Sequence, residues 1–109
     1  MLSTLLGSVN KERVLLYLAA RGRGYARQIA RFFEAPLSPV QNALESLEAA
    51  GVLVSRAVGS TREYEFNPRY AARAELAALL DRALFLSPAT LRNELLLSRT
   101  RPRRKGKPL

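Results

Sequence analysis

The hydrophobic period of the chain changes at Gly51. Before this glycine, Val40, Leu44 and Leu47 follow one another at intervals of four and three residues, which is the spacing of one face of an α-helix. After it, residues 52–58 are rich in β-branched and apolar residues, residues 59–61 form a turn, and apolar and polar side chains alternate over residues 62–66. A helix followed at once by a hairpin predicts a mainly α fold with a small β-hairpin, which is an α+β class.

Cap signals indicate where that helix begins. Ser38 is a good N-cap, Pro39 suits the first helical position, and Gln41 stands three residues after the serine, as in a capping box. The helix is therefore expected over residues 38–50, although Pro36 also fits an entry turn and leaves open a start two residues earlier.

Similar signals divide the rest of the chain. The expected helices are a short one built on Leu2, Leu5 and Leu6, one capped by Asn10 that runs to residue 21, one at 26–33, one opened by Asn67 and Pro68 that runs to residue 86, and one at 87–98 opened by Ser87 and Pro88. Residues 21–24 are expected to form a turn. Two short helices joined by a tight turn and followed by a hairpin are the organisation of a winged helix-turn-helix.

A resemblance to a known family supports this order. It is carried by residues 27–33, 37–40, 44–53 and 58–68, which resemble the winged helix-turn-helix of ArsR-type bacterial and archaeal transcriptional regulators. The resemblance covers about residues 8–86. It implies a homodimeric DNA-binding regulator in which terminal helices form the dimer and the third helix of the domain reads the operator.

The chain contains neither cysteine nor histidine. Disulfides, thiolate or imidazole metal sites and Ser-His-Asp or Cys-His nucleophiles are therefore excluded within it. The chain departs here from the metal-sensing ArsR-type regulators, which use cysteine, histidine and carboxylate ligands. We expect no enzyme activity, no metal and no cofactor, and an effector, if the protein has one, is not identified.

The net charge of +9 indicates a polyanionic partner. Residues 99–109 are expected to be a disordered basic tail, whose cationic residues are Arg99, Arg101, Arg103, Arg104, Lys105 and Lys107. No apolar run is long enough to span a membrane, so a cytoplasmic protein without a membrane partner is the default expectation.

The helix after the tight turn carries the expected base contacts. Its face opposite the apolar stripe presents Ser38, Gln41, Asn42 and Glu45. Glutamine and asparagine amides can bond both N6 and N7 of adenine, and serine can reach a base edge or a phosphate. The alternative is that these are only solvated polar side chains of an amphipathic helix.

Phosphate contacts must come from elsewhere, because this helix contains no lysine or arginine. The candidates lie on the preceding helix and on the hairpin, and they are Arg27, Arg31, Arg56, Ser60, Thr61 and Arg62. For any single arginine among them, an ordinary solvated surface position is the alternative.

The expected helix at 67–86 is apolar over more than one face. We expect it to pack against a second copy of the chain through a dimer interface of Leu2, Leu5, Leu6, Leu76, Leu80 and Leu84. The alternative is that the helix covers the core of its own domain.

The predicted organisation has three parts. Residues 1–86 form a winged helix-turn-helix domain with its dimerisation helix, residues 87–98 form a short helix, and residues 99–109 form the tail. The favoured function is a sequence-specific regulator that binds double-stranded DNA, as a homodimeric repressor. The alternatives are a winged-helix module that binds another protein, and a non-specific nucleic-acid binder that acts through the basic tail.

Overall fold

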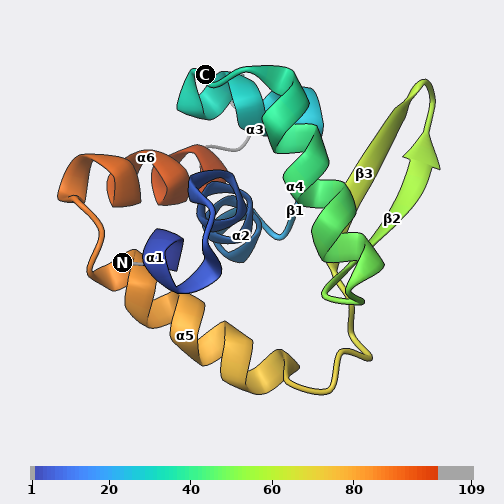
Figure 1. Ribbon diagram of the computed structural model, residues 1–109. Coiled ribbons are helices and arrows are strands. Elements are labelled where there is room, and N and C mark those ends of the chain that lie inside the picture. The colour runs from blue at the N-terminus through green and yellow to red at the C-terminus, as the bar shows by residue number, and fades with distance from the viewer. Residues whose placement is uncertain (1, 101–109) are drawn as a thin grey trace.

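The part of the chain that is described contains six helices and a small antiparallel sheet at their edge (Figure 1). The structure, a computed structural model, describes the backbone of residues 2–100 and the side chains of residues 2–96. Its elements in chain order are α1 (Leu2–Leu6), α2 (Val9–Arg21), β1 (Arg23–Tyr25), α3 (Ala26–Phe33), α4 (Leu37–Ala49), β2 (Leu53–Val58), β3 (Thr61–Phe66), α5 (Arg73–Phe85) and α6 (Ala89–Thr100). Within residues 2–100, no helix is long and apolar enough to cross a membrane.

Helix α2 lies at the centre of the fold, where it packs against α4, α5 and α6 (Figure 1). All five residues of 14–18 are buried, because helices cover α2 on several sides. Ile29, Leu44, Leu80 and Leu95 bring one fully buried side chain each from α3, α4, α5 and α6 to the same core. The β2–β3 hairpin projects beside α4 at the edge of this helical body (Figure 1).

A tight turn joins α3 to α4. Glu34 ends α3 in the left-handed conformation, with φ of 53° and ψ of 45°. The N–H of Ala35 donates to the carbonyl oxygen of Ala30 at 2.9 Å, which closes the turn. A residue with a side chain occupies a conformation that favours glycine, at a cost of about 1 kcal/mol.

The sheet has the order β1–β3–β2, with both pairs antiparallel. The predicted hairpin is present, but the turn expected at 21–24 is wrong in part, because residues 23–25 form a third strand. Gly24 pairs with Tyr64 across this strand and lies directly against Tyr17. A Cβ atom on Gly24 would lie 2.8 Å from Cε1 of Tyr17, so only glycine fits there without movement.

Two helices begin earlier in the chain than the sequence analysis predicted. Helix α2 is capped by Ser8, whose Oγ accepts from the N–H of Lys11 at 3.1 Å, so the expected cap at Asn10 is wrong. Helix α4 begins at Leu37 with Pro36 as its N-cap, which is the earlier of the two starts that the sequence left open.

Helix α5 begins later than expected. Asn67 does not open it, because its side chain donates to the carbonyl oxygen of Gly51 at 2.9 Å and accepts from the N–H of Arg69 at 3.0 Å. The bond to Gly51 fastens the end of the hairpin to the residues that follow α4. The chain then passes through turns and enters the helix at Arg73.

Three leucines that were assigned to a dimer interface belong to the core of the single chain. Leu2 and Leu80 are each 1% exposed, and Leu84 is 9% exposed. These residues are buried within the single chain, because α1 and α5 both pack on α2. Leu6 and Leu76 are partly buried, whereas Leu5 is 69% exposed.

The last helix is longer than expected. Helix α6 runs to Thr100, so Arg99 belongs to the helix and not to the tail that was predicted to begin there. The other predicted tail cations, Arg101, Arg103, Arg104, Lys105 and Lys107, lie outside the described residues.

Candidate nucleic-acid interface

Helix α4 turns a polar face to solvent. Val40, Ala43, Leu44 and Leu47 are buried against the rest of the domain. The predicted base-contacting residues Ser38, Gln41, Asn42 and Glu45 are all exposed on the other side. The 3.6-residue period of the helix separates the two sets. The polar set is therefore accessible to a ligand as large as a nucleic acid.

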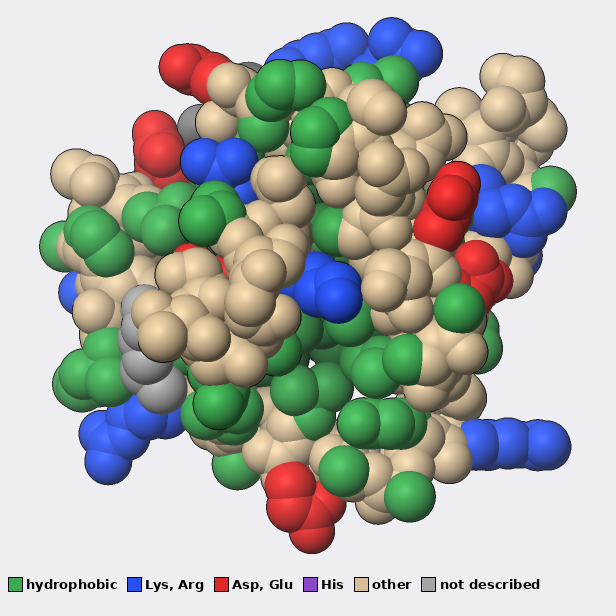
Figure 2. All heavy atoms as spheres, viewed as in Figure 1, with side chains coloured by type: hydrophobic (Ala, Val, Ile, Leu, Met, Phe, Trp, Pro, Cys, Tyr) green, Lys and Arg blue, Asp and Glu red, His purple; other side chains and the backbone are tan. Residues whose placement is uncertain are grey.

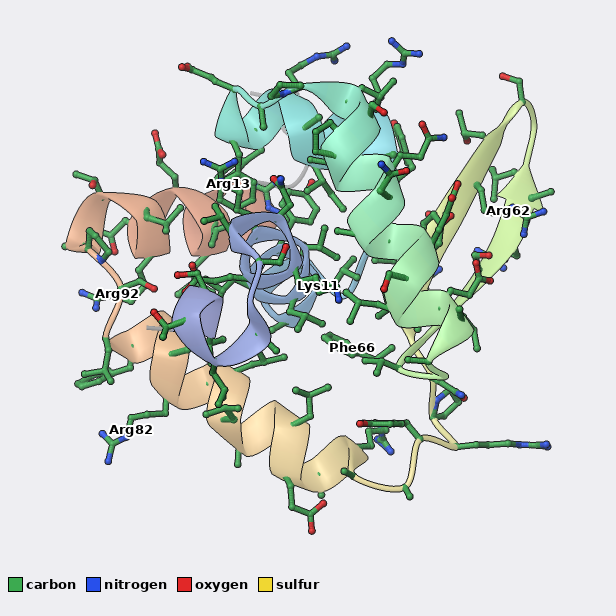
Figure 3. All side chains as sticks on the ribbon, in the orientation of Figure 1. Lys11, Arg13, Arg62, Phe66, Arg82 and Arg92 are labelled. Atoms are coloured by element: carbon green, nitrogen blue, oxygen red, sulfur yellow. The ribbon has the colours of Figure 1, made fainter. Side chains whose placement is uncertain are left out.

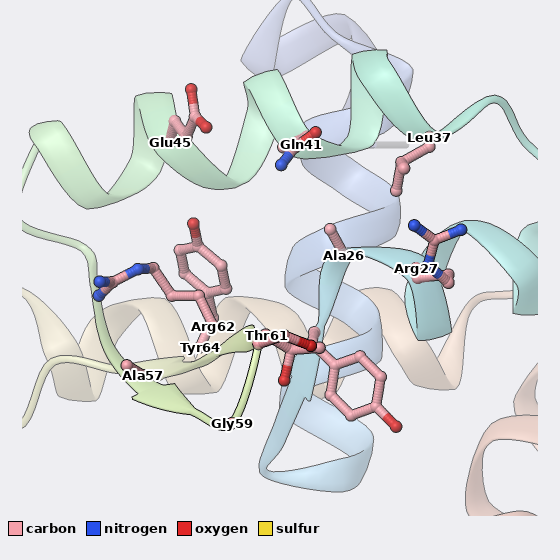
Figure 4. Close-up of a pocket in the computed structure, with 12 residues that line it drawn as sticks. Ala26, Arg27, Leu37, Gln41, Glu45, Ala57, Gly59, Thr61, Arg62 and Tyr64 are labelled. Carbon is pink, nitrogen blue, oxygen red and sulfur yellow. The ribbon is translucent and has the colours of Figure 1, made fainter.

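A groove of about 430 Å³ lies between α4 and the hairpin (Figure 4). Its lining combines α3, α4, β1 and the hairpin, and the residues are Tyr25, Ala26, Arg27, Leu37, Gln41, Glu45, Ala57, Gly59, Ser60, Thr61, Arg62 and Tyr64. Figure 4 shows Arg27 and Arg62 on either side of the view, with Gln41 projecting from α4 between them. The fold thus brings six of the predicted site residues to one groove.

Arg62 is held in place by a chain of hydrogen bonds that links the hairpin to α4. Its Nη1 donates to Oγ of Ser55 at 3.0 Å, and that hydroxyl donates to Oε2 of Glu48 at 2.6 Å. Figure 3 shows Arg62 on the hairpin, across the view from Arg82 and Arg92. The guanidinium is positioned beside α4 without being neutralised directly by a carboxylate.

Arg56, on the same hairpin, is paired with a carboxylate, unlike Arg62. Its Nε and Nη2 donate to Oε1 of Glu63 at 3.2 and 3.0 Å. Arg23 also lies 3.8 Å from Glu63 and 3.6 Å from Glu65. Among the residues with described side chains, Arg27, Arg31 and Arg62 have no ion pair, so they are better placed than Arg56 to meet a phosphate.

Arg31, Ser60 and Thr61 differ in their relation to the groove, because only Ser60 and Thr61 line it. Arg31 is exposed on α3 but does not line the groove. The hydroxyl of Thr61 donates to the carbonyl oxygen of Val58 at 2.8 Å and so closes the hairpin turn. Ser60 is exposed at the tip.

A buried phenol borders the groove. Burial raises the pKa of Tyr64, and the carboxylates of Glu48 and Glu45 raise it further, so the hydroxyl stays neutral. The hydroxyl is a potential hydrogen-bond donor toward the groove side of α4 (Figure 4).

The sequence did not identify every residue of the site. Tyr25 lines the groove from β1, and no signal marked this strand, which is three residues long. The roles of Ser55 and Glu48 follow from the hairpin register and from the packing of β2 on α4, which only the structure gives.

Figure 2 shows cationic side chains at several separate places on the face in view, with neighbouring ones at its top edge. Among the described residues, no cluster of three or more carboxylate, cysteine or histidine side chains could hold a metal ion. The chemistry of the groove is therefore that of separate guanidinium, amide, hydroxyl and carboxylate groups.

Comparison with solved structures assigns the fold. A MarR-family transcriptional regulator from Silicibacter pomeroyi matches with a TM-score of 0.59 and 21% identity, over 89% of this chain and 71% of that one. The adhesin competence repressor (AdcR) from Streptococcus pyogenes matches with a TM-score of 0.54 and 18% identity, over 88% of this chain and 75% of that one. The fold is a winged helix-turn-helix.

This result confirms the predicted fold class. The matched structure from Silicibacter pomeroyi is described as MarR family, so the comparison does not support the ArsR type in particular. Neither a protein-family model nor a curated protein sequence matches the chain. In a winged helix-turn-helix, α3 and α4 are the two helices of the motif and the β2–β3 hairpin is the wing.

Proposed function

We propose that this protein is a transcriptional regulator that binds double-stranded DNA through α4 and the wing. The observation that carries the proposal is the exposed amide face of α4 beside the groove that Arg27 and Arg62 border. A major groove about 12 Å wide admits an α-helix, and amide side chains on its outer face can then reach base edges.

The neighbouring arginines supply the positive charge that α4 lacks. No lysine or arginine occurs in α4, so the attraction to the phosphate backbone has to come from its neighbours. Arg27 precedes α4 and Arg62 follows it in the chain, which allows contacts on both sides of an inserted helix. Arg31 adds a third cation on α3.

We also propose that the protein acts as a homodimer. Four large apolar side chains are exposed on α1, at the start of α2, at the end of α5 and in the loop after it: Leu5, Val9, Phe85 and Leu86. Val9 and Leu86 line the same hollow of about 410 Å³. A second copy that covers this surface would replace the interface first assigned to Leu2, Leu80 and Leu84.

A binding measurement tests the DNA-binding proposal. Fluorescence anisotropy with duplexes selected from a random library should show affinity that falls steeply with salt and rises for a pseudo-palindrome. Gln41→Ala and Asn42→Ala should reduce the preference for the selected sequence more than they reduce binding to bulk DNA. The proposal fails if no duplex outcompetes bulk DNA.

Sedimentation tests the dimer. Leu86→Asp should shift the protein toward monomer, because a carboxylate would be buried in the apolar contact. Val58→Asp is the matched control, since Val58 is also exposed but lies on the wing. A monomer at micromolar concentration in the wild type would contradict the proposal.

The mode of regulation that we propose is repression, because a dimer that occupies a DNA site excludes other proteins from it. The ArsR-type assignment and a role for the tail remain predictions, and deletion of residues 101–109 tests the tail.

A second candidate function is binding to another protein, which the acidic composition of α4, without any lysine or arginine, favours. Retained partner binding after charge reversal of Arg27 and Arg62 would support that alternative.

A further inference from the structure

Glu45 occupies the middle of the exposed face of α4. With 3.6 residues per turn, it lies two turns after Ser38 and within about 20° of it around the helix. Gln41 and Asn42 lie on either side of this line. Glu45 also lines the groove with Gln41, one turn further along the same helix (Figure 4).

The position of this carboxylate raises an electrostatic problem. Glu45 is exposed and makes no hydrogen bond or ion pair with the described side chains or backbone. No basic residue on α4 compensates it. If α4 enters the major groove, the carboxylate meets base edges and phosphates without a cation beside it, which is unfavourable unless a base supplies a donor.

The four bases differ in what they offer at the major-groove edge. Guanine presents two acceptors, and thymine presents an acceptor and a methyl group. The amino donor of adenine lies between two acceptors, its own N7 and O4 of the paired thymine, whereas the N4 amino donor of cytosine adjoins an acceptor, O6 of the paired guanine, on one side only. Cytosine is therefore the base whose edge best suits an unpaired carboxylate.

We propose that Glu45 is a specificity-determining residue that accepts a hydrogen bond from the N4 amino group of cytosine. This inference rests on the proposed function and names the DNA sequences that the site takes. They contain a G·C pair whose cytosine faces the middle of α4, once in each half-site of a dimer. At guanine and thymine, which present no donor, Glu45 repels, so it selects against them as well as for cytosine.

Glu48 provides a matched control on the same helix. It lies three residues further on and is half-buried, and its Oε2 accepts from the hydroxyl of Ser55 at 2.6 Å. It is engaged with the wing and is not free to meet a base. Glu48→Gln removes the same charge as Glu45→Gln, and because Glu48 acts through Ser55 on Arg62, a phosphate-contacting residue, it changes the affinity for all sequences alike and leaves the base preference unchanged.

The experiment is a selection of duplexes from a random library by the wild type, Glu45→Gln and Glu48→Gln, followed by affinity measurements. The wild type should select cytosine at one position in each half-site. There, replacing the cytosine should weaken binding by about 5- to 150-fold, the range for one mismatched pair. Glu45→Gln should lose this preference or change it to adenine, which suits an amide. Glu48→Gln should keep it.

A chemically modified duplex isolates the contact. N4-methylcytosine keeps its pairing with guanine while the methyl group replaces the amino hydrogen that faces the major groove. At the selected position it should weaken binding of the wild type by a factor similar to a mismatch and leave Glu45→Gln almost unaffected. Circular dichroism of the exposed-site variants confirms that they are folded.

The outcomes separate the inference from the proposed function. If the wild type binds a selected sequence but Glu45→Gln keeps the cytosine preference, the inference is overturned while DNA binding stands. A selected sequence that has no cytosine opposite α4 would also overturn the inference and leave DNA binding standing. If no duplex is bound in preference to bulk DNA, the proposed function and this inference fail together.

Discussion

Two arginines of the wing give a direct test of how the protein contacts phosphates. Arg62 donates to Ser55 and borders the groove, whereas Arg56 donates twice to Glu63 and does not line it. Both side chains are exposed, and replacing either by alanine changes the net charge equally. If Arg62 contacts a phosphate and Arg56 does not, only Arg62→Ala should reduce the number of counterions released on binding.

The expected magnitude follows from the contacts. Each phosphate contact contributes about 0.9 to the slope of log K against log salt, so Arg62→Ala should lower the slope by about 1.8 in a homodimer. At 0.1 M salt this corresponds to a loss of about 60-fold in affinity. Arg56→Ala should change the slope by clearly less, because Glu63 already lies 3.0 Å from its guanidinium.

Fluorescence anisotropy with one duplex at several salt concentrations, from about 50 to 200 mM, measures both slopes. The sequence of the duplex should not matter, since a phosphate contact carries no base preference. Equal slope changes for the two variants would show that the ion pair with Glu63 does not distinguish them. An unchanged slope in Arg62→Ala would refute the phosphate contact.

Three further predictions concern stability. Arg21→Ala should lower the free energy of unfolding by about 2–3 kcal/mol in urea denaturation, because the guanidinium donates to the hydroxyl of the buried Tyr17 at 3.0 Å and lies 4.8 Å from its ring centroid. Arg92→Ala, which removes a hydrogen bond from a half-buried arginine to the carbonyl oxygen of Phe85, should change it by less than about 1 kcal/mol. Glu34→Gly should raise it by about 0.5–1 kcal/mol in thermal unfolding, since glycine relieves the left-handed strain at φ of 53°, and a lower value would contradict that reading. Burial raises the pKa of Tyr64 above its ordinary value of 10.0, so in the unfolded chain the phenol loses its proton first and stability should fall as pH rises above 10. Urea titrations on both sides of pH 10 should show a smaller fall in Tyr64→Phe, and an equal fall would refute the linkage.

Local patterns predicted the parts of the fold that depend on neighbouring residues in the chain. The apolar stripe of Val40, Leu44 and Leu47 identified the buried face of α4, and so the exposed face also. The start of α5 could not be predicted, because Asn67 is a good cap by type and its side chain is bound instead to Gly51, far away in sequence. Leu80 likewise required knowledge of which element covers it.

The candidate site was predictable to the same degree. The exposed residues of α4 follow from one helix, but the difference between Arg56 and Arg62 depends on the strand register. Arg56 stands opposite Glu63, whereas Arg62 stands opposite Ala57. A shift of the hairpin by one residue would place Arg56 opposite Arg62 or opposite Tyr64 in place of Glu63, and composition alone does not fix the register.

Strand β1 has a consequence for the thermodynamics of association. It pairs with β3 and leads directly into α3, so the wing is fastened to the helical body along a second edge. A hairpin attached only at its base would lose conformational entropy on meeting a partner, and that loss would weaken the complex. Here the entropy is lost when the chain folds, so the spacing between Gln41 and Arg62 is already set in the free protein.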